Sequence, residues 1–303
     1  MTVHVVHENP EWLPPFAAAF EAEGVDWDEV LVTGGPLDLT AEPAPGVYWS
    51  RMSASAATRG HDISAEHARG LFDCLEAYGR RVVNGRAVLD LELSKLRQLA
   101  LLRAAGIAVP RTVAVMGAAP ADVLAAARTL GGPVVVKPNR GGKGLGVQRF
   151  DSPESLEAAL PGLPEPVDGV LLVQEYVAPA EPRITRAELV GAEFVYAITA
   201  DTGRGGFQLC PADACAVDGT PESLFALQPS VPPDLIRAYE GFARRHGIEV
   251  AGFEFLETAD GRTVTYDVNT NTNYNPEVEA VAPRSAARAV AAYLGRLDKE
   301  NSP

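Results

Sequence analysis

The 303-residue sequence has few cysteines and contains no long apolar run. Its 3 cysteines, an odd and sparse number, do not suit a disulfide framework and favour a reducing compartment. No window approaches the roughly 18 uninterrupted apolar residues of a membrane span. The short apolar start of the chain has no basic flank, which is typical of a buried strand and not of a signal peptide. These absences predict a cytoplasmic protein.

Positive charge is also scarce. The sequence has 26 lysines and arginines against 40 acidic residues, which gives a formal net charge of −14 and a pI near 4.8. Because such a field repels nucleic acid and anionic lipid, we expect neither as a partner. Hydrophobic residues make up 47% and charged residues 22%, as in an ordinary soluble globular protein. The length suggests roughly two or three compact modules.

Short apolar runs alternate with helical patterns, which predicts an α/β or α+β fold. Residues 1–90 are expected to form a small parallel-sheet domain, and no dinucleotide fingerprint follows its first strand. Its expected strands are 3–6, 30–32, 47–49 and 82–83, and its expected helices are 14–23, stopped by Gly24, and 64–79, capped by Ser64.

We expect two further subdomains, which consist of residues 91–173 and 174–303. The expected helices of these stretches are 91–105, 121–130, one starting at Ser152, and 232–247. The expected strands include 112–115, 134–136 and 147–150.

A glycine-rich loop lies between two of these strands. Lys137 directly follows the first strand, and the loop after it contains Gly141, Gly142, Gly144 and Gly146. Glycines allow backbone N–H groups to approach phosphate oxygens closely. A P-loop would lead from its lysine into a helix, whereas Lys143 is followed by Gly144 and a strand. The layout predicts a flap over a nucleotide; the alternative is a flexible hairpin with solvated Arg140 and Lys143.

A hairpin near the C-terminus carries three oxygen-bearing side chains. Asp267 and Asn269 alternate onto one face of a strand, and Glu254 lies on the preceding strand, where pairing can bring it opposite. Two carboxylates and an amide oxygen form a hard-oxygen site suited to Mg²⁺ that bridges phosphates. The alternative is a solvated polar face. Phenylalanines on both sides of Glu254 favour burial, and buried carboxylates without a cation are costly.

The order of these motifs resembles the ATP-grasp superfamily and, within it, the RimK-like glutamate ligases. A lysine-bearing helix is followed by Val-Val-Lys with a glycine flap, by Val-Gln-Glu-Tyr-Val at 173–177, and by the Asp-x-Asn hairpin. The similarity runs from about Asn84 to Pro276. It implies an ATP-grasp fold with an N-terminal parallel-sheet domain, a central lid subdomain and a C-terminal antiparallel-sheet subdomain. It also implies an ATP-dependent carboxylate–amine ligase that acts through an acylphosphate and releases ADP and phosphate.

The resemblance assigns roles to individual residues of this sequence. Lys95 and Lys137 would contact phosphates, and Lys137 and Arg186 would be the catalytic residues. The other implied ATP-binding residues are Gly142, Lys143 and Gly144 in the flap, Gln174, Glu175, Tyr176 and Val177 at the adenine, and Glu181 at the ribose. The implied ligands of Mg²⁺, or of Mn²⁺ as an alternative, are Glu254, Asp267 and Asn269.

Three positions depart from the family pattern. Ile184 stands where an acidic residue usually precedes the arginine, and Asp267 replaces the usual glutamate of the metal strand. The stretch 206–211 stands where glutamate ligases carry a motif with Arg and Asn, which puts glutamate as the substrate in question. The resemblance implies a small-molecule or peptide carboxylate and an amine as substrates, and a dimer or tetramer as the assembly.

Several residues keep open interpretations. Arg51 and Arg59 either face the cleft or are solvated, and we favour substrate binding for the polar run that contains Asn271 and Asn273. Cys210 and Cys215 are interpreted as a pocket feature or half of a metal site; with no second pair or nearby histidine, their spacing does not favour zinc. His61 and His67 are interpreted as structural or exposed. Two other functions stay open: a small-molecule kinase of the ATP-grasp type and a non-catalytic ATP-binding regulatory module.

Overall fold

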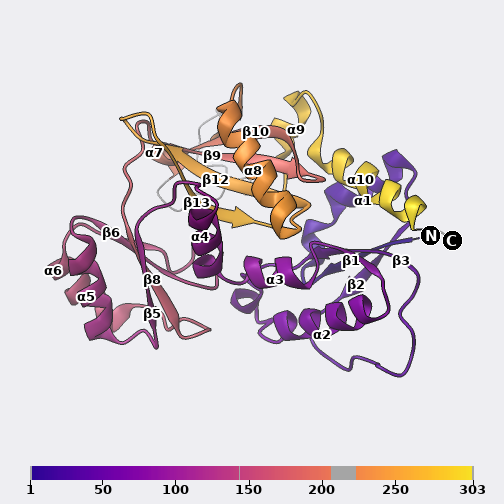
Figure 1. Ribbon diagram of the computed structural model, residues 1–303, viewed down its shortest axis with the longest axis horizontal. Coiled ribbons are helices and arrows are strands. Elements are labelled where there is room, and N and C mark those ends of the chain that lie inside the picture. The colour runs from indigo at the N-terminus through magenta and orange to yellow at the C-terminus, as the bar shows by residue number, and fades with distance from the viewer. Residues whose placement is uncertain (1, 143, 206–222, 302–303) are drawn as a thin grey trace.

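The computed structural model describes residues 2–142, 144–205 and 223–301, and contains one parallel and two antiparallel sheets (Figure 1). Their strand orders are β2-β1-β3-β4, β5-β8-β6-β7 and β11-β10-β9-β12-β13. The mixed α/β architecture confirms the predicted fold class. No helix in the described ranges combines the length and the apolar character that a bilayer crossing requires.

The first sheet is parallel, as expected from the alternating pattern of the first ninety residues or so. Its strands are β1 (Thr2–His7), β2 (Trp27–Leu31), β3 (Gly46–Arg51) and β4 (Arg81–Val83). The helical elements are η1 (Pro10–Trp12), α1 (Pro14–Glu23), η2 (Ala56–Arg59) and α2 (Ser64–Ala77). Helix α1 ends at Gly24, whose left-handed φ of 62° favours glycine. Ser64 is not the cap that the sequence suggested: it is the first helical residue, buried, and Ile63 occupies the cap.

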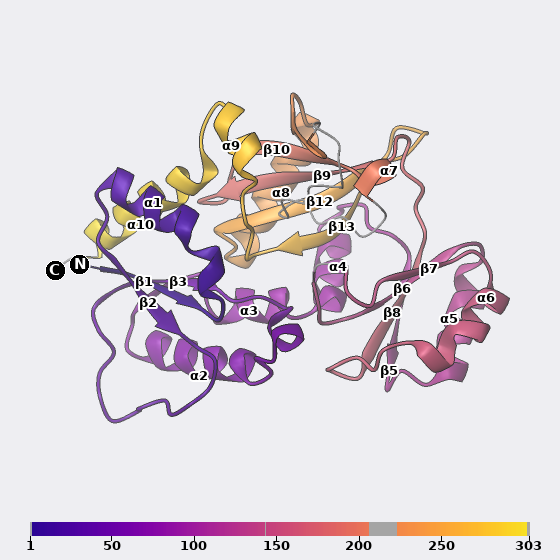
Figure 2. The same cartoon turned by 180° about the vertical axis from the view of Figure 1, so that it is seen from behind.

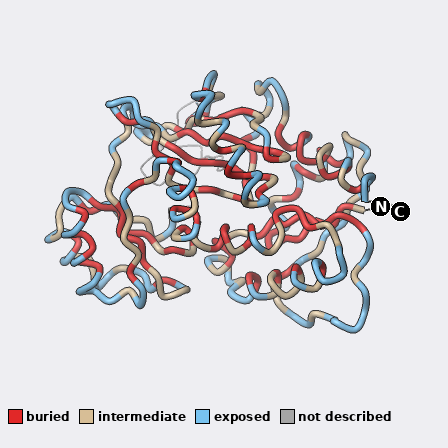
Figure 3. Tube along the Cα trace, viewed as in Figure 1, coloured by how far each residue is buried: buried red, intermediate tan, exposed pale blue. Residues whose placement is uncertain are grey.

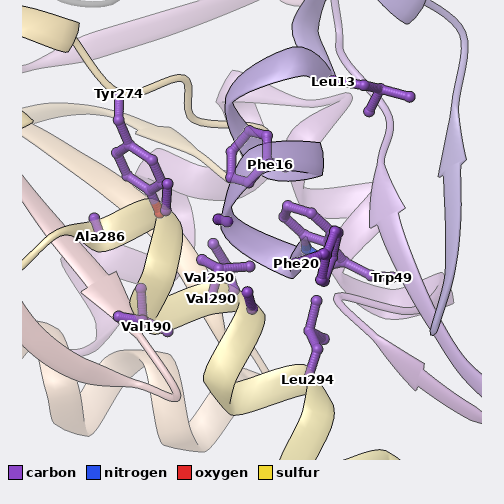
Figure 4. Packing of buried hydrophobic residues seen from close by; sticks show 14 of the residues in the cluster. Leu13, Phe16, Phe20, Trp49, Val190, Val250, Tyr274, Ala286, Val290 and Leu294 are labelled. Carbon is purple, nitrogen blue, oxygen red and sulfur yellow. The ribbon is translucent and has the colours of Figure 1, made fainter. Parts of the chain in front are cut away.

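The last helix of the chain, α10 (Ala286–Glu300), packs against this first domain. Val290 and Leu294 of α10 share a buried cluster with Phe20 and Trp49 (Figure 4). The two ends of the described chain consequently lie close together in both views (Figures 1 and 2). The proposed division at 90 and 173 stays a prediction, and α10 is a C-terminal element whose apolar face is buried in the N-terminal core.

The single helix expected from Leu91 to Ala105 is wrong. The structure has α3 (Arg86–Glu92) and α4 (Lys95–Ala104) instead. Ser94 separates them in an extended conformation, and its hydroxyl accepts a hydrogen bond from the Arg97 backbone at 3.2 Å. A serine cap starts a new helix because it satisfies a backbone donor that has no partner inside the helix. Lys95 is therefore the first residue of α4.

The central sheet is an antiparallel unit that carries the glycine loop. Its elements are β5 (Thr112–Met116), α5 (Pro120–Leu130), β6 (Val134–Pro138), β7 (Gln148–Phe150), α6 (Pro153–Ala159), η3 (Leu160–Gly162) and β8 (Val170–Glu175). Strands β6 and β7 are antiparallel, with Val134 opposite Phe150, which confirms the predicted strand–loop–strand layout. The predicted Ser152 cap is also confirmed, as part of a capping box with Ser155.

The C-terminal sheet provides the other wall of the site. Its elements are β9 (Arg183–Val190), β10 (Glu193–Asp201), α7 (Thr202–Gly205), β11 (Phe225–Gln228), α8 (Pro233–His246), β12 (Val250–Glu257), β13 (Thr263–Asn269) and α9 (Pro276–Val281). The strands of this sheet form one of the most continuously buried parts of the chain (Figure 3). On one face Tyr239 and Phe242 of α8 pack against Phe253 and Phe255 of β12. Glu254 lies between these phenylalanines and therefore faces the opposite side.

Candidate active site

Three adjacent strands bring their charged side chains into one row. Glu254 of β12 is in register with Asp267 of β13 on one side and with Arg186 of β9 on the other. Residues that are opposite each other on neighbouring strands point to the same face of the sheet. The expectation that pairing would place Glu254 opposite Asp267 is thus confirmed, and Arg186 extends the row.

The next row of the sheet explains how Arg186 is held. It contains Glu188, Gly252 and Asn269 in register. A Cβ atom at Gly252 would lie 2.7 Å from Arg186 Cδ and 3.0 Å from Glu188 Oε2. The missing side chain therefore leaves the space in which Arg186 Nε donates to Glu188 Oε1 at 2.5 Å. The sequence analysis missed Glu188 and Gly252, which do not belong to any recognisable motif.

The arginine–glutamate pair is further tied to the loop after β13. Arg186 also donates to the carbonyl of Asn273 at 2.8 Å, and the Thr272 hydroxyl donates to Glu188 Oε2 at 3.0 Å. Arg186 and Glu188 are 2% and 0% exposed. Burial raises the pKa of Glu188, although Arg186 acts in the opposite direction. A charge-assisted pair with further hydrogen bonds is rigid, so the guanidinium has a fixed position.

Lys95 joins the row from the first turn of α4. Its ammonium donates to both carboxylate oxygens of Asp267, at 2.7 and 2.6 Å. Burial alone would lower the pKa of Lys95, but Asp267 outweighs it and the pKa is raised. Lys95 is therefore a charged group at neutral pH, and Asp267 is the acidic residue that holds it in place.

Lys137 lies on β6, across the site from this row. It is 5% exposed, and no hydrogen bond or ion pair holds its ammonium within the ranges that the structure describes. Burial, followed by repulsion from Lys95, lowers the pKa of Lys137 to about 8. A buried ammonium without a counter-ion is costly, and an anion placed beside it would remove that cost. Lys137 is thus suited to bind an anionic ligand.

Glu254 is a buried carboxylate whose pKa is shifted in the direction opposite to that of Lys137. It is 7% exposed, and Asn269 Nδ2 donates to its Oε1 at 2.9 Å. Burial, with repulsion from Asp267, raises the pKa of Glu254 to about 7. The described part of the chain contains no cluster of three or more His, Cys, Asp or Glu residues. The oxygen donors at this position are instead the carboxylates of Glu254 and Asp267 and the amide of Asn269. This donor set fits a hard divalent cation such as Mg²⁺.

A cavity separates the central sheet from the C-terminal sheet at this point. The residues predicted to bind ATP that line it are Lys95, Lys137, Gly142, Gly144, Gln174, Glu175, Tyr176 and Val177, and the predicted metal ligands Glu254, Asp267 and Asn269 line it as well. Glu181 is not part of this lining, and its exposed carboxylate pairs with Arg183 at 3.2 Å. Lys143 lies outside the described residues.

A second cavity continues from the first toward the N-terminal domain. It shares Lys95, Gly141, Gly142, Asp267 and Asn269 with the first cavity. The N-terminal domain contributes Trp12 and residues 53–55, and the C-terminal part contributes Arg186 together with Asn271, Thr272 and Asn273. The predicted substrate residues Asn271 and Asn273 therefore lie beside the predicted nucleotide residues.

Comparison with known proteins agrees with this geometry. The family model of the RimK-like ATP-grasp domain matches residues 93–214. A probable alpha-L-glutamate ligase from Picosynechococcus sp. is 26% identical over 229 residues, which cover 75% of this chain and 70% of that protein. A RimK domain ATP-grasp protein from Sphaerobacter thermophilus has a TM-score of 0.69 at 20% identity, over 98% of this chain and 99% of its own.

Residues 93–214 therefore resemble the RimK-like ATP-grasp domain, and the solved ATP-grasp structure shares the fold of the chain. A further solved structure, the ATP-grasp ligase PsnB with minimal precursor, Mg and ADP, has a TM-score of 0.67 at 16% identity, over 96% of each chain. The RimK-like match begins just before α4 and includes Lys95, the flap and Arg186. It ends before the metal hairpin, which the topology of the C-terminal sheet adds to the site.

Arg51 does not line either cavity. It is 1% exposed and donates to the Thr272 carbonyl at 2.7 Å and to Asn273 Oδ1. Its guanidinium lies 4.3 Å from the ring centre of Phe16 and 5.2 Å from that of Trp49. Arg51 therefore fixes the loop that also receives Arg186, and it is neither solvated nor a cleft residue.

Replacement of Arg51 by methionine is expected to lower the free energy of unfolding by about 2–4 kcal/mol, because the buried Thr272 carbonyl and the partly buried Asn273 amide lose their charged donor. Urea denaturation measures this change. The matched control is Arg237→Met on α8, where the arginine side chain is 68% exposed and pairs only at the surface. The control is expected to change stability by less than about 0.5 kcal/mol. Equal effects of the two substitutions would contradict the role of Arg51.

Some features predicted from the sequence lie outside the described residues. These are Cys210, Cys215 and the stretch 206–211. His61 is partly buried, and its Nδ1 lies 2.8 Å from Glu8 Oε2, which agrees with a structural interpretation. Arg59 pairs with the same carboxylate and is 22% exposed. The sequence analysis missed Glu92, which is buried and accepts hydrogen bonds from the backbone and hydroxyl of Thr270 at 2.7 and 2.9 Å.

Proposed function

We propose that the protein activates a carboxylate with ATP and joins it to an amine through an acylphosphate. The observation that carries this proposal is the junction of the two cavities. Lys95, Gly142 and Asp267 line both of them, so a phosphate held at one cavity is adjacent to a substrate held in the other. Adjacent, oriented reactants are the main requirement of phosphoryl transfer, which needs no protein nucleophile.

The chemistry proceeds in two steps. A carboxylate oxygen attacks the γ-phosphorus, and the bond from that phosphorus to the β,γ-bridging oxygen breaks, which releases ADP. The amine nitrogen then attacks the carbonyl carbon, the bond from that carbon to the phosphate oxygen breaks, and the nitrogen loses a proton. Lys95 and Lys137 neutralise phosphate oxygens, and Arg186 stabilises the negative charge that develops at the acyl group.

The glycine loop excludes water from this reaction. Gly142 lies against Ser55 of the N-terminal domain, since a Cβ atom at Gly142 would be 3.3 Å from Ser55 Cβ. The loop thus contacts the N-terminal domain at the place where the two cavities join. Exclusion of water prevents hydrolysis of the acylphosphate, which would consume ATP without forming a product.

Glu254, Asp267 and Asn269 are the residues that would hold a divalent cation. The cation would be Mg²⁺, with Mn²⁺ as a substitute, and it would supply charge neutralisation of the transferred phosphoryl group. Asp267 accepts a hydrogen bond from Lys95, and Glu254 is a buried carboxylate with a raised pKa. The proposed substrates are a small-molecule or peptide carboxylate and an amine, and the proposed assembly is a dimer or tetramer.

ADP release, screened against pools of carboxylates and amines with mass spectrometry of the products, tests the proposed function. We expect ADP release that depends on both substrates and a product joined by an amide bond. A stable phosphorylated product formed without any amine would identify a kinase instead. Binding of ATP without ADP release across the whole screen would identify a regulatory module.

Replacement of Arg186 by methionine is expected to lower kcat by about 100-fold to 1,000-fold, because one preorganised donor to a developing anion is removed. The KM for ATP should change little, since Arg186 lines the second cavity and not the nucleotide cavity. Steady-state kinetics of ADP release separates the two parameters. A large rise in the KM for ATP with an unchanged kcat would contradict the proposed role.

A further inference from the structure

Trp12 brings a large apolar surface to the second cavity. It is the last residue of η1, a single turn that directly follows the carboxyl end of β1. Ligands of parallel sheets bind beyond the carboxyl ends of the strands, and Trp12 lies at such an end. The other side chains of the cavity are mainly polar or charged, among them Ser53, Glu92 and Asn271. The indole is therefore the main apolar surface that a bound substrate would meet there.

A network built on the buried Glu8 carboxylate lies beside this indole. The Arg59 guanidinium lies 4.6 Å from the ring centre of Trp12 and covers one of its faces. Arg59 is itself fixed by the Glu8 carboxylate, whose side chain is 0% exposed, and by the Ser55 hydroxyl at 2.9 Å. His61 lies 2.8 Å from the second oxygen of the same carboxylate. Because burial of a carboxylate is costly unless it is paired, this arrangement indicates that the position of Arg59 is well determined.

One face of the Trp12 ring is thus in contact with a cation. A cation over one face of an aromatic ring is attracted by the ring quadrupole. Trp12 also lines the second cavity, so its indole is available to a substrate bound there. Aromatic rings attract other aromatic rings beyond the burial of apolar area, and they also pack well against bulky apolar groups.

We propose that Trp12 is a specificity-determining residue, which selects a substrate with an aromatic or branched aliphatic group next to its reacting carboxylate or amine. The inference rests on the proposed ligase function, because it assigns the second cavity to the substrates. It adds the chemical class of the group that lies beside the reaction centre. Glutamate, with its charged side chain, is a poor match for such a surface.

Steady-state ADP release with a fixed ATP concentration tests this inference. The probes are glycine, alanine, leucine, phenylalanine and glutamate, each of which offers both a carboxylate and an amine, in parallel with any pair active in the wider screen. Background ADP release without added substrate is subtracted. We expect the kcat/KM of wild-type protein for leucine or phenylalanine to exceed that for glycine by about 10-fold.

Trp12→Ala should reduce this preference to about 3-fold or less through KM, with kcat and the KM for ATP nearly unchanged. Trp12→Phe should keep most of the preference, and Arg59→Met, which leaves the aliphatic stem but removes the charge, should weaken it partly. The matched control is Trp27→Phe, since Trp27 stacks on Phe20 in the N-terminal core and lines neither cavity. ADP binding, measured by calorimetry, shows that each variant retains its nucleotide cavity.

The experiment distinguishes a failure of the inference about Trp12 from a failure of the proposed ligase function. If the preference is unchanged in Trp12→Ala, or if wild-type protein prefers glycine or glutamate, the inference about Trp12 is overturned and the ligase function stands. If no combination of carboxylate and amine stimulates ADP release by wild-type protein, the proposed function itself fails, and the inference fails with it.

Discussion

Lys137→Ala is expected to reduce ATP turnover by about 1,000-fold while the protein remains folded. The buried side chain of Lys137 lines the proposed nucleotide cavity, and burial lowers its pKa to about 8. Loss of the Lys137 ammonium would leave the phosphate oxygens without one of their two proposed lysine partners during phosphoryl transfer. Removal of a poorly compensated buried charge should leave the thermal midpoint unchanged or raise it, which is opposite to the effect of losing an ordinary packing contact.

The measurement is ADP release together with thermal unfolding of the same preparation. Lys299→Ala is the matched control, since Lys299 lies near the end of α10, outside both cavities. The control should retain turnover within about 2-fold. Near-normal turnover in Lys137→Ala would contradict the assignment of the nucleotide cavity, whereas a collapsed thermal midpoint would show that the lysine stabilises the fold.

Asp267→Asn is expected to have an effect of similar or larger size, about 1,000-fold or more, because the residue serves two partners. Its carboxylate binds the Lys95 ammonium in the structure and lies opposite Glu254 across the proposed metal position. The amide side chain keeps the shape but loses the charge. A weaker cation site requires more Mg²⁺, so the Mg²⁺ concentration for half-maximal ADP release should also rise about 10-fold or more.

Titration of ADP release with Mg²⁺ gives both quantities. Asp260→Asn provides the matched control on the same hairpin, where Asp260 forms an exposed pair with Arg262 at 2.8 Å. The control should leave the Mg²⁺ dependence unaltered. An unchanged Mg²⁺ requirement in Asp267→Asn would exclude this residue as a ligand, even if turnover fell through the loss of its contact with Lys95.

Local sequence patterns correctly predicted several of the helices and strands that surround the site. Helix α1 begins at Pro14 and ends at Gly24 as predicted, and the two strands around the glycine loop pair as predicted. The terminal hairpin also has the expected register near Glu254 and Asp267. Each of these features depends on residues that are close in sequence, such as a glycine that ends a helix or an alternation along a strand.

The break at Ser94 shows the limit of such patterns. Leu91 and Leu99 fit one continuous helical periodicity, yet the structure starts α4 only at Lys95. The carbonyl of Asn139 accepts a hydrogen bond from the Lys95 backbone at 3.2 Å, and Asn139 Oδ1 accepts one from the Leu96 backbone at 2.8 Å. Donors at the start of α4 are thus satisfied by a residue from the end of β6, which periodicity alone does not reveal.

The sequence by itself determined two local parts of the proposed site: a glycine loop after Lys137 and a hairpin with Glu254, Asp267 and Asn269. Only the tertiary structure decided how Arg51 acts, that Gly252 makes room for the pair of Arg186 and Glu188, and that Trp12 reaches the second cavity. The physical reason is the range of the interactions. A turn or a strand register is set by neighbours along the chain, whereas Arg51 meets residues 221 and 222 positions away, and such contacts exist only after the domains have packed.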